Sequence, residues 1–195
     1  LLEEPAGLSL VRGSGEEKHL RGDELVAALL RFLVGGVEQH AELATLFEEL
    51  DPDAFVRRGT MGGGEWSAKD VAAHLGSWEE FSLGAIDGFR RDERPTIEEL
   101  YEIRTGDQIN EQEAERFLDA EATVVLARFE DLHRRLMSEI AAMSDGEWAA
   151  EYAFDPDDDT LGERIGSLLG SDDGRFTHAS AHLPDLRAYV DATRR

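Results

Sequence analysis

Apolar residues recur at helical spacing in four long stretches of the chain. These stretches span about residues 23–50, 67–90 and 106–143, with a fourth that follows Gly174. The third is expected to break near Leu118, and Asp51-Pro52 is expected to end the first. No alternation of apolar and polar residues is long enough to predict a strand. The pattern therefore predicts an all-α protein built as a four-helix bundle.

Cap residues predict where several of the helices begin. In a capping box, a Ser or Thr side chain accepts a bond from the third backbone amide, and an acidic side chain returns one. The pattern occurs at Ser67 with Asp70, at Thr96 with Glu99, and at Thr160 with Glu163. The last two open short accessory helices, and a further helical turn is expected around Trp148. Asp119 is predicted to cap the segment that follows the break.

The pattern also indicates how the chain is divided. Residues 1–22 hold four glycines and little periodicity, so we interpret them as an N-terminal tail. Residues 23–195 then form a single bundle domain, long enough to bury a core. The segment 53–65 is predicted to be a loop.

No apolar run approaches the roughly 20 residues of a membrane helix, and no secretory leader is seen. We therefore expect a cytoplasmic protein without a membrane partner.

Composition narrows the chemistry that the domain can perform. Cysteine is absent, so a bound metal must be held by His, Asp or Glu. The 43 acidic and 20 basic residues give a formal charge of −23. Such a surface repels phosphate backbones, so no nucleic-acid partner is expected. The acidic run at 155–159 lacks the spacing of an EF-hand loop and is interpreted as a solvated loop.

Two of the six histidines lie four residues apart in the last predicted helix. Residues at that spacing share a helix face, with Cβ atoms about 5–6 Å apart, so His178 and His182 could converge on one ion. The pair alone is weak support for a metal site. His74 strengthens it, because Val71 and Trp78 place this histidine toward the bundle interior. The alternative for His74 is a core histidine satisfied by its neighbours.

The remaining histidines carry less information. His40 falls near the apolar stripe of the first helix and is interpreted as a buried or rim residue. His133 has arginines beside it and is expected at the surface, and His19 lies in the tail. Other site classes find no support, since the glycine-rich segment at 59–67 lacks the Lys of a P-loop. No G-x-S-x-G nucleophile motif occurs either.

Three stretches resemble a known family. GEWSAKDVAAHLGSWEEF at 64–81 is similar to the second-helix signature of DinB-like four-helix proteins. The likeness is closest to the ClbS/DfsB branch and to the related N-terminal domain of mycothiol-dependent maleylpyruvate isomerases. FTHASAHLPDLRAYV resembles the closing helix of that family, with its H-x-x-x-H pair, and DQINEQ at 107–112 resembles a stretch that ends in Asn. The resemblance extends in helix order over about residues 23–193.

The resemblance implies an up-down-down-up bundle with short accessory helices and a divalent metal. Carried over by position, the metal ligands are His74, His178 and His182. Three imidazoles leave a coordination position open and suit zinc or nickel. Relatives use such a metal to activate a low-molecular-weight thiol, which would be a cosubstrate here. Trp78 and Asn110 are candidate substrate-binding residues, with core packing as the alternative for Trp78 and a helix cap or solvent exposure as the alternatives for Asn110.

Three functions are consistent with these features. The first is a metal-dependent transferase or isomerase that uses a small thiol, or a hydrolase of a small molecule. The second is a metal-independent protein of the ClbS/DfsB type that binds a toxic small molecule and confers resistance. The third is an interaction module whose acidic face recognises a basic partner. A small-molecule ligand and a homodimer are expected for the first two.

Overall fold

The structure, a computed structural model, describes residues 22–61, 65–171 and 174–195, with side chains from residue 35 onward. Helices and isolated β-bridges are the regular elements of the described residues. The long helices are α1 (Gly22–Glu48), α3 (Ala68–Arg91), α6 (Ala122–Ala142) and α9 (His178–Thr193). The shorter helices are α2 (Pro52–Phe55), α4 (Thr96–Ile103), α5 (Gly106–Arg116), α7 (Asp145–Trp148) and α8 (Leu161–Leu168). The predicted tail at 1–22 lies outside the described residues except for Gly22.

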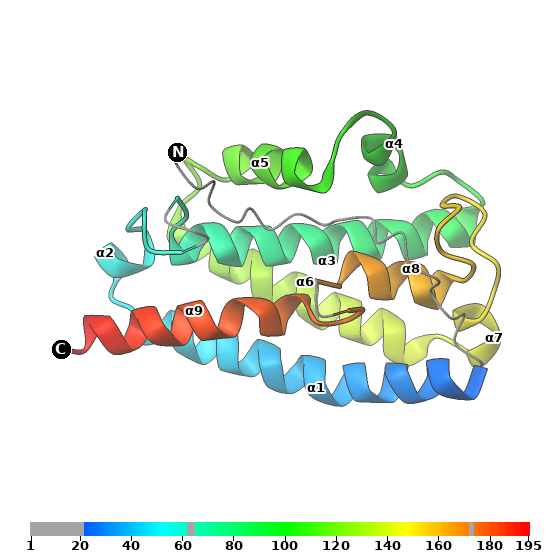
Figure 1. The fold of residues 1–195 in the computed structure, drawn as a ribbon, viewed down its shortest axis with the longest axis horizontal. Coiled ribbons are helices and arrows are strands. Elements are labelled where there is room, and N and C mark those ends of the chain that lie inside the picture. The colour runs from blue at the N-terminus through cyan, green and yellow to red at the C-terminus, as the bar shows by residue number, and fades with distance from the viewer. Residues whose placement is uncertain (1–21, 62–64, 172–173) are drawn as a thin grey trace, which may run out of the picture.

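The four long helices form the predicted up-down-down-up bundle. Helices α1 and α9 run in one direction, and α3 and α6 run in the other (Figure 1). Helix α9 packs on α1, while α8 packs on α3 and extends the bundle beyond the start of α9. The fold class is therefore confirmed. Part of the predicted loop at 53–65 is helical, because Asp51 caps α2 with its side chain.

Local capping explains which of the predicted helix starts are correct. Ser67 and Thr160 each form a full capping box at the start of α3 and α8. The capping box predicted for Thr96 and Glu99 at the start of α4 is wrong, since Pro95 occupies the cap position and makes no side-chain bond. Helix α6 begins at Ala122 without a side-chain cap, so the cap predicted at Asp119 is also wrong.

The break between α5 and α6 is held by a residue of α3. The Lys69 ammonium donates to the carbonyl oxygens of Phe117, Leu118 and Ala120 at 3.3, 2.7 and 3.0 Å. A cation suits the carbonyl-rich C-terminal end of a helix. The long-range contact, rather than a local cap, therefore fixes where the third predicted stretch divides.

Two apolar clusters fill the bundle and meet near the middle of α3. The first includes Ala73 and Leu75 and is completed by residues of α1, α2, α6 and α9. The second includes Trp78 and is completed by residues of α3 to α8. His74 thus sits where the two clusters adjoin.

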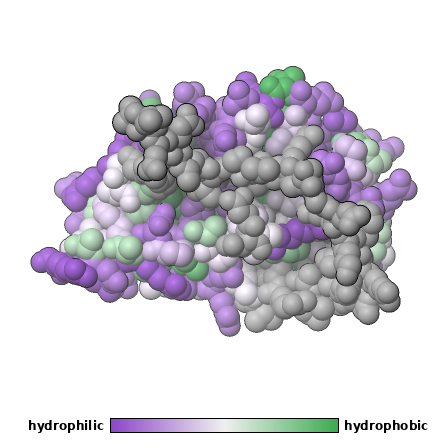
Figure 2. Space-filling view, in the orientation of Figure 1, coloured by the Kyte–Doolittle hydropathy of each residue, from purple (hydrophilic) through white to green (hydrophobic). Residues whose placement is uncertain are grey.

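The face in Figure 2 is mostly hydrophilic where described residues are visible. Among the described residues, no helix combines the length and apolar content needed to cross a bilayer.

The connection from α8 to α9 fixes where the last helix begins. Phe176 is not part of α9; it has a φ of 62° and stacks on Trp148. Its ring covers Gly166 so closely that a Cβ there would lie 2.8 Å from the ring. Backbone bonds from Phe176 to Gly166 and from His178 to Leu169 fasten the connection to α8. His178 is therefore the first residue of α9.

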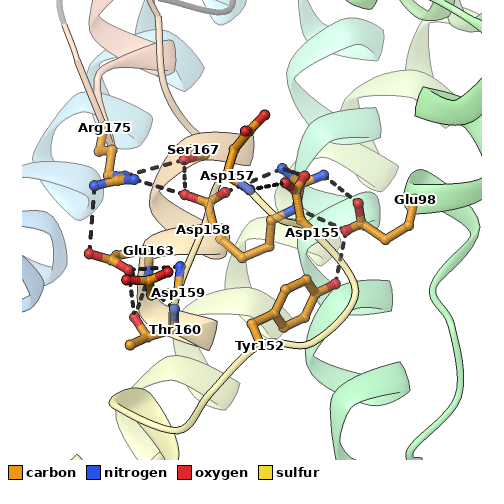
Figure 3. A network of polar contacts seen from close by, with 11 residues as sticks. Glu98, Tyr152, Asp155, Asp157, Asp158, Asp159, Thr160, Glu163, Ser167 and Arg175 are labelled. Carbon is orange, nitrogen blue, oxygen red and sulfur yellow. Dashed lines mark hydrogen bonds and ion pairs between the residues drawn. The ribbon is translucent and has the colours of Figure 1, made fainter. Parts of the chain in front are cut away.

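A buried ionic network supports the same region (Figure 3). Arg164 of α8 binds both carboxylate oxygens of Glu98 in α4 at 2.8 Å. It also pairs with Asp155 and Asp158, and Asp158 in turn accepts from Arg175 at 2.8 Å. The interpretation of residues 155–159 as a solvated loop is therefore wrong at Asp158, which is buried. Paired charges hold the acidic run against α8.

Candidate metal centre

The three predicted histidines converge in the structure. His74 comes from α3, and His178 and His182 come from the first two turns of α9. The Nε2 atoms of His74 and His178 are 2.7 Å apart. One ring nitrogen from each of the three residues lies within 4.8 Å of the others. The i, i+4 spacing thus brings two imidazoles to one face of α9, opposite the third.

Burial keeps the three imidazoles neutral. His74 and His182 are 5% and 7% exposed, and His178 is half-buried. Burial lowers the pKa of His178 to about 3, with a contribution from His182. Burial also lowers the pKa of His182 to about 4, although nearby Asp185 opposes the change, and it lowers the pKa of His74 well below its usual value. Near neutral pH the cluster therefore offers lone pairs rather than charges.

The contact between His74 and His178 can be made by a proton or by a cation. One ring nitrogen of a neutral imidazole carries a proton, so one Nε2–H can donate to the other Nε2 at 2.7 Å. If both Nε2 atoms are unprotonated, a cation must lie between them. The other nitrogen of His74, Nδ1, is buried without a hydrogen-bond partner. The hydrogen bonds of the described residues thus leave one buried nitrogen of the cluster without a partner.

Aromatic residues surround the cluster. The His74 ring lies 4.9 Å from Trp66, and the His178 ring lies 6.1 Å from Trp78. Trp78 is a core residue at 2% exposure, and its indole N–H donates to Asn110 Oδ1 at 3.0 Å. Asn110 is therefore not a helix cap; it lies inside α5 and orients the indole. Whether either residue binds a substrate stays a prediction.

A second polar cluster was not predicted from the sequence. His133 Nδ1 and Glu79 Oε1 are 2.7 Å apart, and both side chains are only 12% exposed. The His40 ring stacks on His133 with a centroid distance of 3.6 Å. The surface position expected for His133 is therefore wrong. Its spacing of four residues from buried Phe129 is the signal that could have indicated an inward side.

A small cavity lies between the two clusters. It holds about 30 Å³, and its lining includes His40, Glu79 and His133 of the second cluster and His178 of the first. Apolar residues, among them Leu75, complete its wall. A space of this size accommodates a water molecule, which needs about 10–15 Å³ by the same measure. The cavity thus connects the three-histidine cluster with a carboxylate and two further imidazoles.

Acid is expected to destabilise the metal-free protein through the buried histidines. The unfolded chain takes up protons on these residues near pH 6.5, whereas folded His182 does so only near pH 4. Between these values the unfolded state binds more protons, so stability falls as the pH is lowered. His182 alone should account for roughly 2–3 kcal/mol at pH 4.5.

Urea unfolding at pH 7.0 and 4.5 in the presence of a chelator measures this effect. The matched variant is His182→Gln, which keeps a polar side chain but does not titrate in this range. It should lose less stability on acidification than the wild type. Equal losses in the two proteins would show that His182 has an ordinary pKa.

The family of the chain follows from its sequence. Residues 37–166 match the family described as Mycothiol maleylpyruvate isomerase N-terminal domain, which is part of the DinB-like superfamily. The match covers more than half of the chain, so the protein belongs to this family. The matched residues include His74 but end before His178 and His182. No curated protein matches the chain.

Two solved structures have a similar fold. The crystal structure of an uncharacterised protein from Escherichia coli has a TM-score of 0.63 and 14% identity, and the alignment covers 89% of this chain and 94% of that one. The colibactin self-resistance protein ClbS, crystallised in complex with a dsDNA, has a TM-score of 0.59 and 16% identity. That alignment covers 89% and 96% of the two chains. These similarities support the ClbS-related, DinB-like fold predicted from the sequence.

The ClbS complex corrects one expectation. Nucleic acid was excluded as a partner because of the net charge of −23. That exclusion is wrong, since a protein of the same fold has been solved with a dsDNA. Net charge sums over the whole surface, whereas contacts to phosphates depend on the local arrangement of cations. Overall acidity is therefore no argument against nucleic acid for this fold.

Proposed function

We propose that this protein is a divalent-metal-dependent enzyme acting on a small molecule, with the metal held by His74, His178 and His182. The convergence of three neutral imidazoles, two of them buried, is the observation that carries the proposal. Three protein ligands leave a coordination position for a further molecule, which is typical of catalytic sites. Imidazole nitrogens suit zinc or nickel.

The donor set fits such an ion on its own chemistry. The three pKa values are lowered, so a metal need not displace protons from the ligands near neutral pH. In the tautomers with both Nε2 atoms unprotonated, a cation would also accept the lone pairs that His74 and His178 direct at each other. Burial among Trp66 and Trp78 excludes bulk water, which strengthens electrostatic interactions at the site.

The proposed reaction class is transfer or isomerisation with a low-molecular-weight thiol, or hydrolysis of a small molecule. A bound divalent metal would act as a Lewis acid that lowers the pKa of a thiol or water beside it. The family name, with its reference to mycothiol, supports the thiol alternative. In this proposal Trp78, fixed by its bond to Asn110, forms the wall of the pocket beside His178 and positions the substrate.

Elemental analysis of the purified protein tests the proposal. We expect about one zinc or nickel ion per chain after dialysis, with a tetrahedral or five-coordinate geometry. The loaded protein should then accelerate the reaction of small thiols with electrophiles, and a chelator should abolish that rate. A chain that neither retains nor takes up a divalent metal would rule out this function.

The structural similarity to ClbS favours a second candidate function. In that alternative the protein binds a small toxic molecule in the bundle without a metal and confers resistance. Ligand binding would then raise the melting temperature equally with and without chelator. Double-stranded DNA should be included as a partner in these assays, over a range of salt concentrations. A chelator-sensitive effect would favour the metal enzyme instead.

A further inference from the structure

The pair formed by Glu79 and His133 has no role in the proposed function. The two residues face each other from α3 and α6, 54 positions apart in the chain, with Nδ1 and Oε1 separated by 2.7 Å. Each has one further polar atom, Glu79 Oε2 or His133 Nε2, that is buried without a hydrogen-bond partner. Two unpartnered atoms beside a cavity indicate a site that a further group completes.

The arrangement resembles an oriented base. With Nδ1–H donating to the carboxylate, the Nε2 atom of His133 is left as a proton acceptor. A carboxylate that fixes the tautomer and orientation of an imidazole is the general arrangement for general-base catalysis. The cavity next to the pair is large enough for a water molecule, and His178 also lines it.

A shared metal ion suits this second cluster less well. The rings of His40 and His133 are stacked with an interplanar angle of 6°. An imidazole lone pair lies in the plane of its ring. Because the two rings are stacked in parallel planes, their lone pairs cannot point at one common position. An ion in the plane of one ring would lie above the plane of the other. The stack therefore favours a proton site over a common ligand set.

The titratable groups around His133 include one counter-charge for an imidazolium and two neutral imidazoles. Burial raises the pKa of Glu79, while His133 and Arg128 act against that rise. Burial and His133 together lower the pKa of His40 to about 3, so His40 stays neutral and covers one ring face. His178 in α9 is likewise neutral. The Glu79 carboxylate is thus the partner that an imidazolium at His133 would have.

We infer that His133, positioned by Glu79, accepts the proton of the nucleophile that binds at the three-histidine cluster, through a water in the shared cavity. The inference rests on the proposed function. The S–H or O–H bond of the nucleophile breaks and its proton passes to the cavity water. That water gives one of its protons to His133 Nε2 and is left neutral. The electron pair stays on sulfur or oxygen, and the imidazolium is balanced by Glu79.

Counting the protons released on thiol binding tests the inference. Co²⁺-loaded protein is titrated with 2-mercaptoethanol in two buffers of different ionisation enthalpy, and the heats give the number of protons passed to the buffer. Thiolate absorption bands of the cobalt report binding independently. In the wild type His133 should keep the proton, so the release is close to zero. In His133→Gln, which can still donate to Glu79, about one proton per thiol should appear.

A second variant and a control make the outcome unambiguous. Glu79→Gln should also release more protons than the wild type, because the imidazolium loses its counter-charge. The control is Ser82→Ala, which removes another buried polar group from α3 that bonds only to a helix carbonyl. It should behave as the wild type. Thiolate bands with equal proton release in all variants would overturn this inference alone, whereas absence of the bands in the wild type would overturn the thiol function as well.

Discussion

Replacing Arg164 by alanine is expected to destabilise the protein by about 3–5 kcal/mol. The guanidinium is 6% exposed and bonds both oxygens of Glu98, which is also buried. Removing it leaves Glu98 and Asp158 as buried carboxylates with fewer compensating bonds. Burial raises the pKa of Glu98, and Arg164 opposes that rise, so the variant should bind a proton at this carboxyl at higher pH.

An exposed arginine provides the control. Arg90 pairs with Glu139 and Glu147 at 2.6 Å, but its side chain is 36% exposed. Screening by water limits such pairs to about 0–1 kcal/mol, so Arg90→Ala should have little effect. Urea unfolding of both variants at pH 7 gives the comparison. If they lost the same stability, the buried network would not support the fold as inferred here.

The position of the helices could be predicted from the sequence because it depends on local spacing. Apolar residues at i, i+3 and i+4 and the caps at Ser67 and Thr160 act within one or two turns. The errors at α2 and α4 come from the local residues Asp51 and Pro95, and the others occur where a residue outside the local turn decides. The break between α5 and α6 is set by Lys69, about 50 residues away, and not by Asp119. Asp158 turns inward because of Arg164 and Arg175, which lie 6 and 17 residues further along the chain.

The candidate site could be predicted only in part for the same reason. The pairing of His178 with His182 is local, whereas His74 is 104 residues from His178. Its inward position beside Val71 and Trp78 connected it to the pair, and the family resemblance implied the same three ligands. For Glu79 and His133 the one local signal was the spacing of four residues between His133 and Phe129. Their neighbours in the sequence are charged on one side and apolar on the other. Only the packing of α3 against α6 decides that these two side chains face inward.

Replacing His182 by alanine is expected to have the largest effect on metal binding. The variant would leave two ligands, His74 and His178, and open the site to water. Loss of a residue that only orients a ligand costs about 10–100-fold in affinity, so loss of a ligand should cost at least about 100-fold. Metal affinity is measured by competition with a chromophoric chelator, and circular dichroism checks that the variant remains folded.

The matched control for this measurement is His40→Gln. His40 is also a partly buried histidine, but it belongs to the second cluster with Glu79 and His133. It should retain metal affinity within a few-fold of the wild type, because the three-histidine cluster keeps all its ligands. The opposite pattern, with affinity lost in His40→Gln and kept in His182→Ala, would place the metal at the second cluster. That result would exclude both the ligand set proposed here and the role of His133 as a proton acceptor.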